Sequence, residues 1–356
     1  MKKKKFAGLI GLLTAAVLTA GAAAGISGTV KSDAAEVTTG TYISELTGLP
    51  ISGALKDQRP VAIMVDNEKF ALPHFGLNQA DIVYEMMNST ANGRITRLMA
   101  VVKDWGSITQ FGSIRSTRPT NFMLAAEYNA ILVHDGGPYY NNMYQRLPYT
   151  NNLSAGFARY SNGKASEFTE YVTYNSYTNP TTGRSYSGLA QRIAAAGFST
   201  TYNQYYQGPN MVFAPTEYIL GEGSTVANAV SLPFPHNSSK LNFNATTGTY
   251  DYSEYNKPHV DALTGAVTTF ENVLVLNCSF TQLDANGYMI YNILTPSSSG
   301  YYMANGRCIP ITWSKASDCG RTMYTNAVTG TPLVFNPGKT YIAIVPSDVW
   351  NKVVIQ

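Results

Sequence analysis

The sequence predicts a mixed α/β or α+β N-terminal domain followed by a smaller, mostly antiparallel β domain. An uninterrupted apolar run, Val61–Val65, has the composition of a strand that is buried on both faces. A helix is expected at Pro119–Tyr128, between strand-like runs, as in mixed α/β cores. After about Gly221 the chain changes to short β-rich runs separated by turns. The 356 residues suit about two domains, which we place at 45–215 and 216–356.

Before these domains, residues 1–26 have the pattern of a signal peptide or an N-terminal membrane anchor. Lys2–Lys5 precede an uncharged apolar run, Phe6–Ile26. Small residues at 20–24 offer cleavage sites, yet a run of about 20 residues is also long enough to span a bilayer. Both outcomes predict an exported protein, either extracellular or anchored to the outer face of the cytoplasmic membrane. Residues 27–44 then form a linker, and membrane contact is expected only through the N-terminal segment, if that segment is retained.

The charge of the chain does not favour nucleic acid as a partner. Four of the 25 basic residues lie in the leader, which leaves 21 against 22 acidic residues. A nearly neutral chain lacks the basic surface that nucleic-acid binding requires. The three cysteines fit no metal-binding spacing. Cys308 and Cys319 could close a short disulfide loop, or they could stay free and buried together with Cys278.

The strongest chemical signal is a concentration of arginines between Asp81 and Gly137. Only 13% of the residues are charged, yet this segment holds Arg94, Arg97, Arg115 and Arg118. The planar guanidinium group suits carboxylate and phosphate. The last two arginines also precede the predicted helix, whose first N–H groups favour an anion. We expect the four arginines to line one cleft for an anionic ligand.

Polar residues at or near the ends of predicted strands complete this candidate site. They are Asp66 and Asn67 after the first strand, Glu85 in the second, and His134 and Asp135 before a Gly-Gly pair. A neutral histidine there could act as an acid or base, but the backbone of the turn is the preferred explanation for its hydrogen bonds.

Two alternatives concern the acidic residues of the segment. Asp66, Asp81 and Glu85 could pair with the arginines as structural ion pairs. Asp66 and Asp81 are also weak candidates for oxygen ligands of a divalent ion. No other metal and no cofactor is expected. Pro258–Asp261 is expected to be a surface turn, with the possibility that it completes an interdomain cleft.

These segments resemble the YerB-like family of bacterial extracytoplasmic proteins, many of them described as lipoproteins, whose domains have no agreed activity. The resemblance covers roughly residues 45–350, and its matching motifs include Arg59–Asn67, Gly76–Glu85, Gly112–Pro119, Val133–Gly137, Pro258–Asp261, Glu271–Val275 and Asn336–Thr340. It implies two domains. Two features depart from the family: there is no lipobox cysteine, and Phe168-Thr169-Glu170 stands where relatives tend to have Pro-His-Asn. These departures put lipid anchoring, and any chemistry of that histidine, in doubt.

Three functions are compatible with the sequence. The first is an exported cell-envelope protein that binds an anionic wall or lipid-linked component in the arginine-lined cleft. The second is a structural or protein-partner module of the envelope, with its arginines paired internally. The third is a phosphotransferase similar to LytR-CpsA-Psr enzymes acting on polyprenyl pyrophosphate-linked glycans, with Mg²⁺ on Asp66 or Asp81. The third rests on an analogy of fold without a motif match. The sequence leaves open whether any reaction is catalysed.

Overall fold

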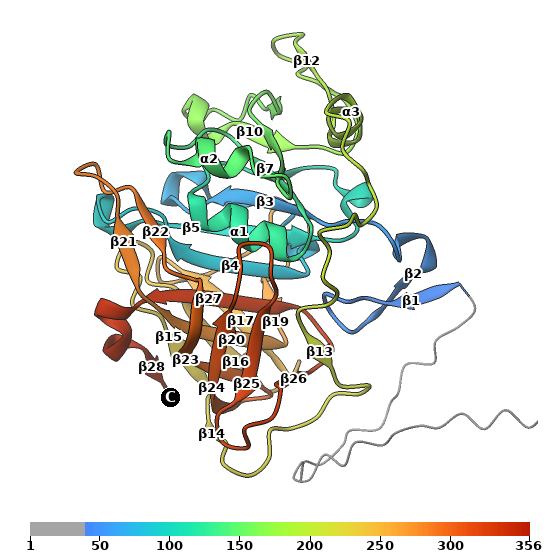
Figure 1. Ribbon diagram of the computed structural model, residues 1–356. Helices are drawn as coiled ribbons and strands as arrows, with labels where there is room; N and C mark the ends of the chain where they lie inside the picture. The colour runs from blue at the N-terminus through green and yellow to red at the C-terminus, as the bar shows by residue number, and fades with distance from the viewer. Residues whose placement is uncertain (1–39) are drawn as a thin grey trace, which may run out of the picture.

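The computed structural model describes residues 40–356, which form a strand-rich protein with few helices (Figure 1). The predicted signal peptide or anchor at 1–26 and most of the linker lie outside the described residues. Within residues 40–356, no helix is both long enough and apolar enough to cross a membrane. The three cysteines are free thiols, and Cys278 and Cys308 are buried.

An 11-stranded sheet runs through the molecule in the order β14-β24-β23-β20-β27-β4-β5-β3-β7-β8, with β25 paired to β24. Its strands are β3 (Val61–Asp66), β4 (Ile82–Met87), β5 (Thr96–Val102), β7 (Ile131–His134), β8 (Asn151–Ser154), β14 (Thr225–Val226), β20 (Asn272–Cys278), β23 (Thr295–Ala304), β24 (Arg307–Lys315), β25 (Thr322–Asn326) and β27 (Thr340–Pro346). The N- and C-terminal parts of the chain meet where β27 pairs in parallel with β4. Strands from both sides of the predicted boundary at 215/216 therefore share one sheet, and the boundary itself stays a prediction.

The central strands are apolar along their whole length because both faces of the sheet are covered. Every residue of β3, β4 and β5 is buried. Alternate side chains enter two separate cores: Val61, Ile63 and Val65 enter one, and Ala62 and Met64 enter the other. Polar groups can reach solvent only where these strands end.

Within residues 40–356, three short α-helices accompany the strands: α1 (Pro119–Glu127), α2 (Asn141–Gln145) and α3 (Leu189–Ala195). Helix α1 begins at Pro119, as predicted, and all its residues are buried against the central sheet. Its N-cap is Arg118, whose backbone N–H donates to Asn121 Oδ1 at 3.0 Å. With so few helices, the strand-rich character is plain, whereas the mixed α/β class of the N-terminal half stays a prediction.

A six-stranded sheet, ordered β18-β17-β16-β15-β28 with β19 on β17, packs against the central sheet, and all its pairings are antiparallel. Its strands are β15 (Ala229–Ser231), β16 (Lys240–Asn244), β17 (Thr249–Glu254), β18 (Lys257–Pro258), β19 (Thr269–Phe270) and β28 (Val354–Ile355). The smaller sheets consist of β1 (Thr41–Ile43), β2 (Pro50–Ser52), β6 (Phe111–Gly112), β9 (Ala158–Arg159), β10 (Glu170–Val172), β11 (Tyr177–Thr178), β12 (Ser185–Tyr186), β13 (Val212–Phe213), β21 (Phe280–Gln282), β22 (Met289–Tyr291) and β26 (Val334–Phe335).

Candidate functional site

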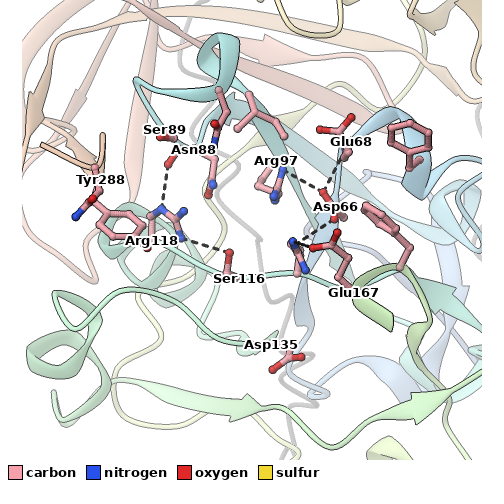
Figure 2. A pocket seen from close by; sticks show the side chains of 16 residues that line it. Asp66, Glu68, Asn88, Ser89, Arg97, Ser116, Arg118, Asp135, Glu167 and Tyr288 are labelled. Carbon is pink, nitrogen blue, oxygen red and sulfur yellow. Dashed lines mark hydrogen bonds and ion pairs between the residues drawn. The ribbon is translucent and has the colours of Figure 1, made fainter. Parts of the chain in front are cut away.

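A cavity of about 580 Å³ lies where β3 ends and β5 begins (Figure 2). Its walls come from the chain after β3, the turn between β4 and β5, the segment before α1, and the loop between β21 and β22. Three of the four predicted arginines line it: Arg97, Arg115 and Arg118. The cavity is therefore shared by segments that are far apart in the sequence.

Arg97 and Arg115 share one buried carboxylate. Asp66 lies opposite Arg97 in the β3–β5 register, and Arg97 Nη1 lies 3.0 Å from Asp66 Oδ1. Arg115 Nε lies 3.2 Å from Asp66 Oδ2, and its Nη2 also pairs with the half-exposed Glu167. Burial raises the pKa of Asp66, and the two guanidinium groups oppose that shift. Asp66 is thus a structural ion-pair partner, as one alternative from the sequence suggested, and it pairs with two arginines at the same time.

Arg118 has no such partner and forms no ion pair with any carboxylate within residues 40–356. Its Nε donates to the Asn88 carbonyl at 3.0 Å, and its Nη1 donates to the Thr117 carbonyl at 2.8 Å. The Tyr288 ring lies against the guanidinium group, with 5.0 Å from Arg118 Cζ to the ring centroid. Only 8% of Arg118 is exposed. Burial, and next the positive charge of Arg97, lower its pKa to about 10, so it stays charged at neutral pH.

Arg94 does not join the cavity, so the expectation that all four arginines line one cleft needs correction. It ends the tight turn Asn92–Arg94 with a positive φ of 60°, which sends its side chain away from Arg97. Its Nη1 lies 3.0 Å from Asp348 Oδ1, and it lines a different cavity. Three residues of separation in a turn are enough to place the two side chains in different cavities.

Glu85 and Asn67 also lie outside the cavity, in a buried polar network. Glu85 Oε1 accepts hydrogen bonds from Asn237 Nδ2 at 2.6 Å and Ser239 Oγ at 2.7 Å, and the Tyr341 hydroxyl donates to Oε2. Asn67 Nδ2 donates to Thr96 Oγ1 at 2.8 Å. Glu85 forms no ion pair with an arginine in the described chain, because its strand position directs it into the core between the two sheets.

His134 and Asp135 have different surroundings although they are adjacent. His134 is buried, and its Nδ1 donates to the Gly136 carbonyl at 2.9 Å, as in the turn-backbone alternative. Burial lowers the pKa of His134 and keeps the imidazole neutral. Asp135 lines the cavity, and its Oδ2 lies 3.4 Å from Arg159 Nη2.

Asp81 cannot share a metal ion with Asp66. Strands β3 and β4 are parallel to each other, since both pair antiparallel with β5. Asp66 ends β3 and Asp81 precedes β4, so the two carboxylates lie at opposite ends of the sheet. Asp81 Oδ2 accepts a hydrogen bond from the Lys103 N–H at 2.6 Å and forms no ion pair with an arginine in the described part.

Comparison with known proteins gives the family. The model of "Protein of unknown function (DUF3048) N-terminal domain" matches residues 46–199, and the corresponding C-terminal domain matches 230–342. The chain belongs to the DUF3048 family. It is 27% identical to "Putative lipoprotein YerB" of Bacillus subtilis (strain 168) over 328 residues, which are 89% of this chain and 90% of that protein. The crystal structure of YerB from Bacillus subtilis has the same fold, with a TM-score of 0.72 at 22% identity, over 88% of this chain and 99% of that one. The resemblance to the YerB-like family is confirmed.

In this DUF3048 protein, sequence reasoning missed the loop between β21 and β22, which brings Asn286 and Tyr288 to the cavity. Gly287 lets the loop close there: its φ is +84°, and a Cβ would lie 2.7 Å from the Ala91 nitrogen. The Asn-Gly pair is a turn signal that could have marked this loop. Phe168 also lines the cavity.

The expected surface turn at Pro258–Asp261 is exposed at Pro258 and Val260 and buried at the other two residues. His259 is 3% exposed and Asp261 is fully buried. Asp261 Oδ2 accepts a hydrogen bond from the Asn78 N–H at 2.8 Å, which ties this turn to the N-terminal part of the chain. The turn does not line the arginine cavity. A short polar motif between strands is predicted to be exposed, because the sequence does not indicate which distant residues cover it.

Proposed function

We propose that this protein is an exported cell-envelope protein that binds an anionic wall or lipid-linked component in the cavity of Arg97, Arg115 and Arg118. Arg118 carries the proposal. A buried cation without a counterion is unfavourable, and a bound carboxylate or phosphate would neutralise it. The description of the relative YerB as a lipoprotein and the apolar leader of this chain both support an envelope location.

The cavity has two chemically different sides, which narrows the class of ligand. Figure 2 shows Arg118 and Tyr288 on one side and Asp66, Glu68 and Glu167 on the other. Carboxylates accept hydrogen bonds from hydroxyl and ammonium groups, whereas the Arg118 side suits an anion. A ligand that carries an anionic group beside hydroxyl or amino groups, such as an acidic or phosphorylated amino sugar, matches both sides. The volume of about 580 Å³ suits a small molecule or the head of a larger one.

The other two functions have less support. A purely structural role would place each arginine against its own acid, as holds for Arg94 with Asp348 but not for Arg118. For a phosphotransferase, Asp66 is already engaged by two arginines and Asp81 is remote from it. No specific observation therefore favours either alternative.

Thermal unfolding of the full chain with a panel of probes tests the proposal. We expect inorganic phosphate, N-acetylmuramic acid and glucosamine phosphate to raise the unfolding temperature, whereas uncharged N-acetylglucosamine does not. Added salt should reduce the effect, because it screens charges. Mass spectrometry of the natively purified protein should reveal a bound anionic molecule. If no anion shifts the unfolding temperature and no anionic molecule co-purifies, the proposal is wrong.

A further inference from the structure

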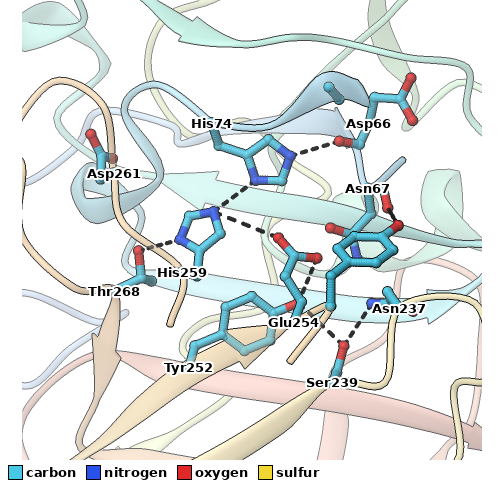
Figure 3. A network of polar contacts seen from close by, with 12 residues as sticks. Asp66, Asn67, His74, Asn237, Ser239, Tyr252, Glu254, His259, Asp261 and Thr268 are labelled. Atoms are coloured by element: carbon cyan, nitrogen blue, oxygen red, sulfur yellow. Dashed lines mark hydrogen bonds and ion pairs between the residues drawn. The ribbon is translucent and has the colours of Figure 1, made fainter. Parts of the chain in front are cut away.

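Two histidines and a glutamate form a second buried cluster, which the proposed function does not use (Figure 3). One ligand atom each from His74, Glu254 and His259 lies within 4.8 Å of the other two. His74 Nδ1 and His259 Nε2 are 2.9 Å apart, and Glu254 Oε1 is 3.9 Å from His259 Nε2. The three residues come from the loop after β3, the end of β17 and the turn after β18. The fold therefore brings two imidazoles and one carboxylate close together.

Hydrogen bonds on the far side of each ring fix the orientation of the imidazoles. His74 Nε2 lies 2.7 Å from the Asp66 carbonyl, which can only accept, so this nitrogen carries the proton. The lone pair of His74 Nδ1 then points into the cluster. His259 Nδ1 lies 2.8 Å from Thr268 Oγ1, and a hydroxyl can donate or accept. His259 Nε2 is therefore free to present its own lone pair. Backbone-carbonyl and side-chain partners of this kind typically orient metal-binding histidines.

The carboxylate of Glu254 provides an independent sign that a cation belongs here. Glu254 is 2% exposed, and its Oε1 has no hydrogen-bond donor within the described residues. That oxygen is directed at the histidine pair (Figure 3). A buried carboxylate oxygen without a partner is unfavourable, and a coordinated cation would satisfy it.

We propose that His74 Nδ1, His259 Nε2 and Glu254 Oε1 bind a Zn²⁺ ion. Tetrahedral bonds of about 2.05 Å place two ligand atoms about 3.3 Å apart. The separations of 2.9 and 3.9 Å differ from that value by about 0.4 and 0.6 Å, and the third separation, His74 Nδ1 to Glu254 Oε1, is at most 4.8 Å, so small side-chain shifts would close the site around the ion. Two imidazoles with one carboxylate suit zinc, whereas Mg²⁺ and Ca²⁺ prefer oxygen ligands alone.

A cavity adjoins the proposed zinc site and offers room for a fourth ligand. A cavity of about 390 Å³ is lined by Glu254 and His259 together with Lys69, Tyr255 and Lys257. The ion and one carboxylate leave a net positive charge, and the two lysines add to it. The fourth ligand is therefore water or a small anion that enters from solvent. Three protein ligands with one open position are the arrangement of reactive zinc sites rather than of closed structural ones.

Metal titration of the full chain tests this proposal without reference to the anionic ligand of the arginine cavity. Chelator-treated protein is dialysed against Zn²⁺ and analysed for total metal, and we expect one ion per chain. Co²⁺ in place of zinc should give the visible absorption of a tetrahedral nitrogen-oxygen site. His259→Ala and Glu254→Gln should each lose stoichiometric binding. Thr268→Val, which keeps all three ligands, should weaken binding by about tenfold or more.

His236→Ala is the matched control, because His236 pairs with Glu68 outside the cluster and its loss should leave zinc binding unchanged. If the wild-type chain takes up no zinc, the histidines are a neutral hydrogen-bonded pair and the proposal is overturned. Full zinc uptake by a folded His259→Ala chain would overturn it as well. If His259→Ala does not fold, two other measurements test the site: the cobalt spectrum of the wild type and the zinc affinity of Thr268→Val. A spectrum that is not tetrahedral, together with an unchanged zinc affinity of Thr268→Val, would refute the assignment.

Discussion

Replacing Arg118 with methionine separates an anion-binding role from a structural role of this arginine. Methionine keeps much of the length of the side chain and removes the charge. In the folded protein the guanidinium group donates to the carbonyls of Asn88 and Thr117 and touches no described carboxylate. A structural arginine would reduce stability when removed, whereas a ligand-binding arginine without a counterion would chiefly reduce affinity.

The expected change in stability is small because two effects oppose each other. Loss of the two hydrogen bonds to backbone carbonyls, whose donor is charged, destabilises by about 1.5–3 kcal/mol each. Removal of a buried cation that lies near Arg97 and Arg115 stabilises by a comparable amount. We therefore expect the free energy of unfolding of the unliganded protein to change by less than about 1 kcal/mol. Loss of a charge-assisted hydrogen bond to the ligand costs about 1.5–3 kcal/mol, which weakens binding roughly 10- to 100-fold.

Urea unfolding measures the stability of Arg118→Met, and calorimetric titration with the most stabilising anionic probe measures its affinity. Arg118→Lys should fall between the wild type and the methionine variant, because it keeps the charge without the bidentate fork. Arg94→Ala is the control, since Arg94 pairs with Asp348 at a different cavity and its loss should not change the affinity. A stability loss above about 3 kcal/mol, or an unchanged affinity in Arg118→Met, would refute the reasoning.

Three further changes have defined outcomes. Lys315→Met should lower the free energy of unfolding by about 3–5 kcal/mol in urea unfolding, because it removes the ion-pair partner of the buried Glu127 at the end of α1. The two groups lie 2.9 Å apart and are fully buried in the wild type, and a loss below about 1 kcal/mol would contradict this reasoning. Burial raises the pKa of Glu170 to about 7, so the protonated form is favoured by folding and the associated stability is lost as the pH rises through 7. Between pH 5 and 8 the free energy of unfolding of the wild type should fall by on the order of 1–2 kcal/mol after solvent screening, and that of Glu170→Gln should fall by less. If the free energies of both proteins depend on pH with the same slope, the pKa shift of Glu170 is not supported. Gly287→Ala should weaken anion binding about tenfold, because a Cβ at this position would lie 2.7 Å from the Ala91 nitrogen and would move Tyr288 away from the cavity. If titration gives the same affinity as for the wild type, this loop has no role in binding.

The sequence predicted the central strands well because burial on both faces leaves an uninterrupted apolar run. The predicted run Val61–Val65 became β3, which extends one residue further to Asp66. The same reasoning placed the helix at Pro119 and the polar residues at strand ends. Three of the four arginines converge for this reason, since strand ends and the start of a helix meet at one edge of the fold.

The remaining features depend on long-range contacts that no local pattern encodes. Arg94 leaves the site through the dihedral angles of a single turn. His74 and His259 touch across 185 positions, and neither lies in an arginine-rich segment. A weak local signal does exist, because three of the four histidines directly follow a proline, at 74, 236 and 259. Proline restricts the backbone before each ring, but it cannot indicate which two rings meet.

Asp66 connects the two proposed sites, and this connection has a thermodynamic consequence. Its side chain holds Arg97 and Arg115 at the arginine cavity, and its carbonyl accepts the hydrogen bond that orients His74. An anion that draws the two arginines toward the cavity therefore acts on the same residue that positions a zinc ligand. Linkage requires the effect to be reciprocal: if the anion changes the affinity for zinc by some factor, zinc changes the affinity for the anion by the same factor. Paired titrations would reveal that factor, and a value of one would mean that the end of β3 is rigid enough to keep the two sites independent.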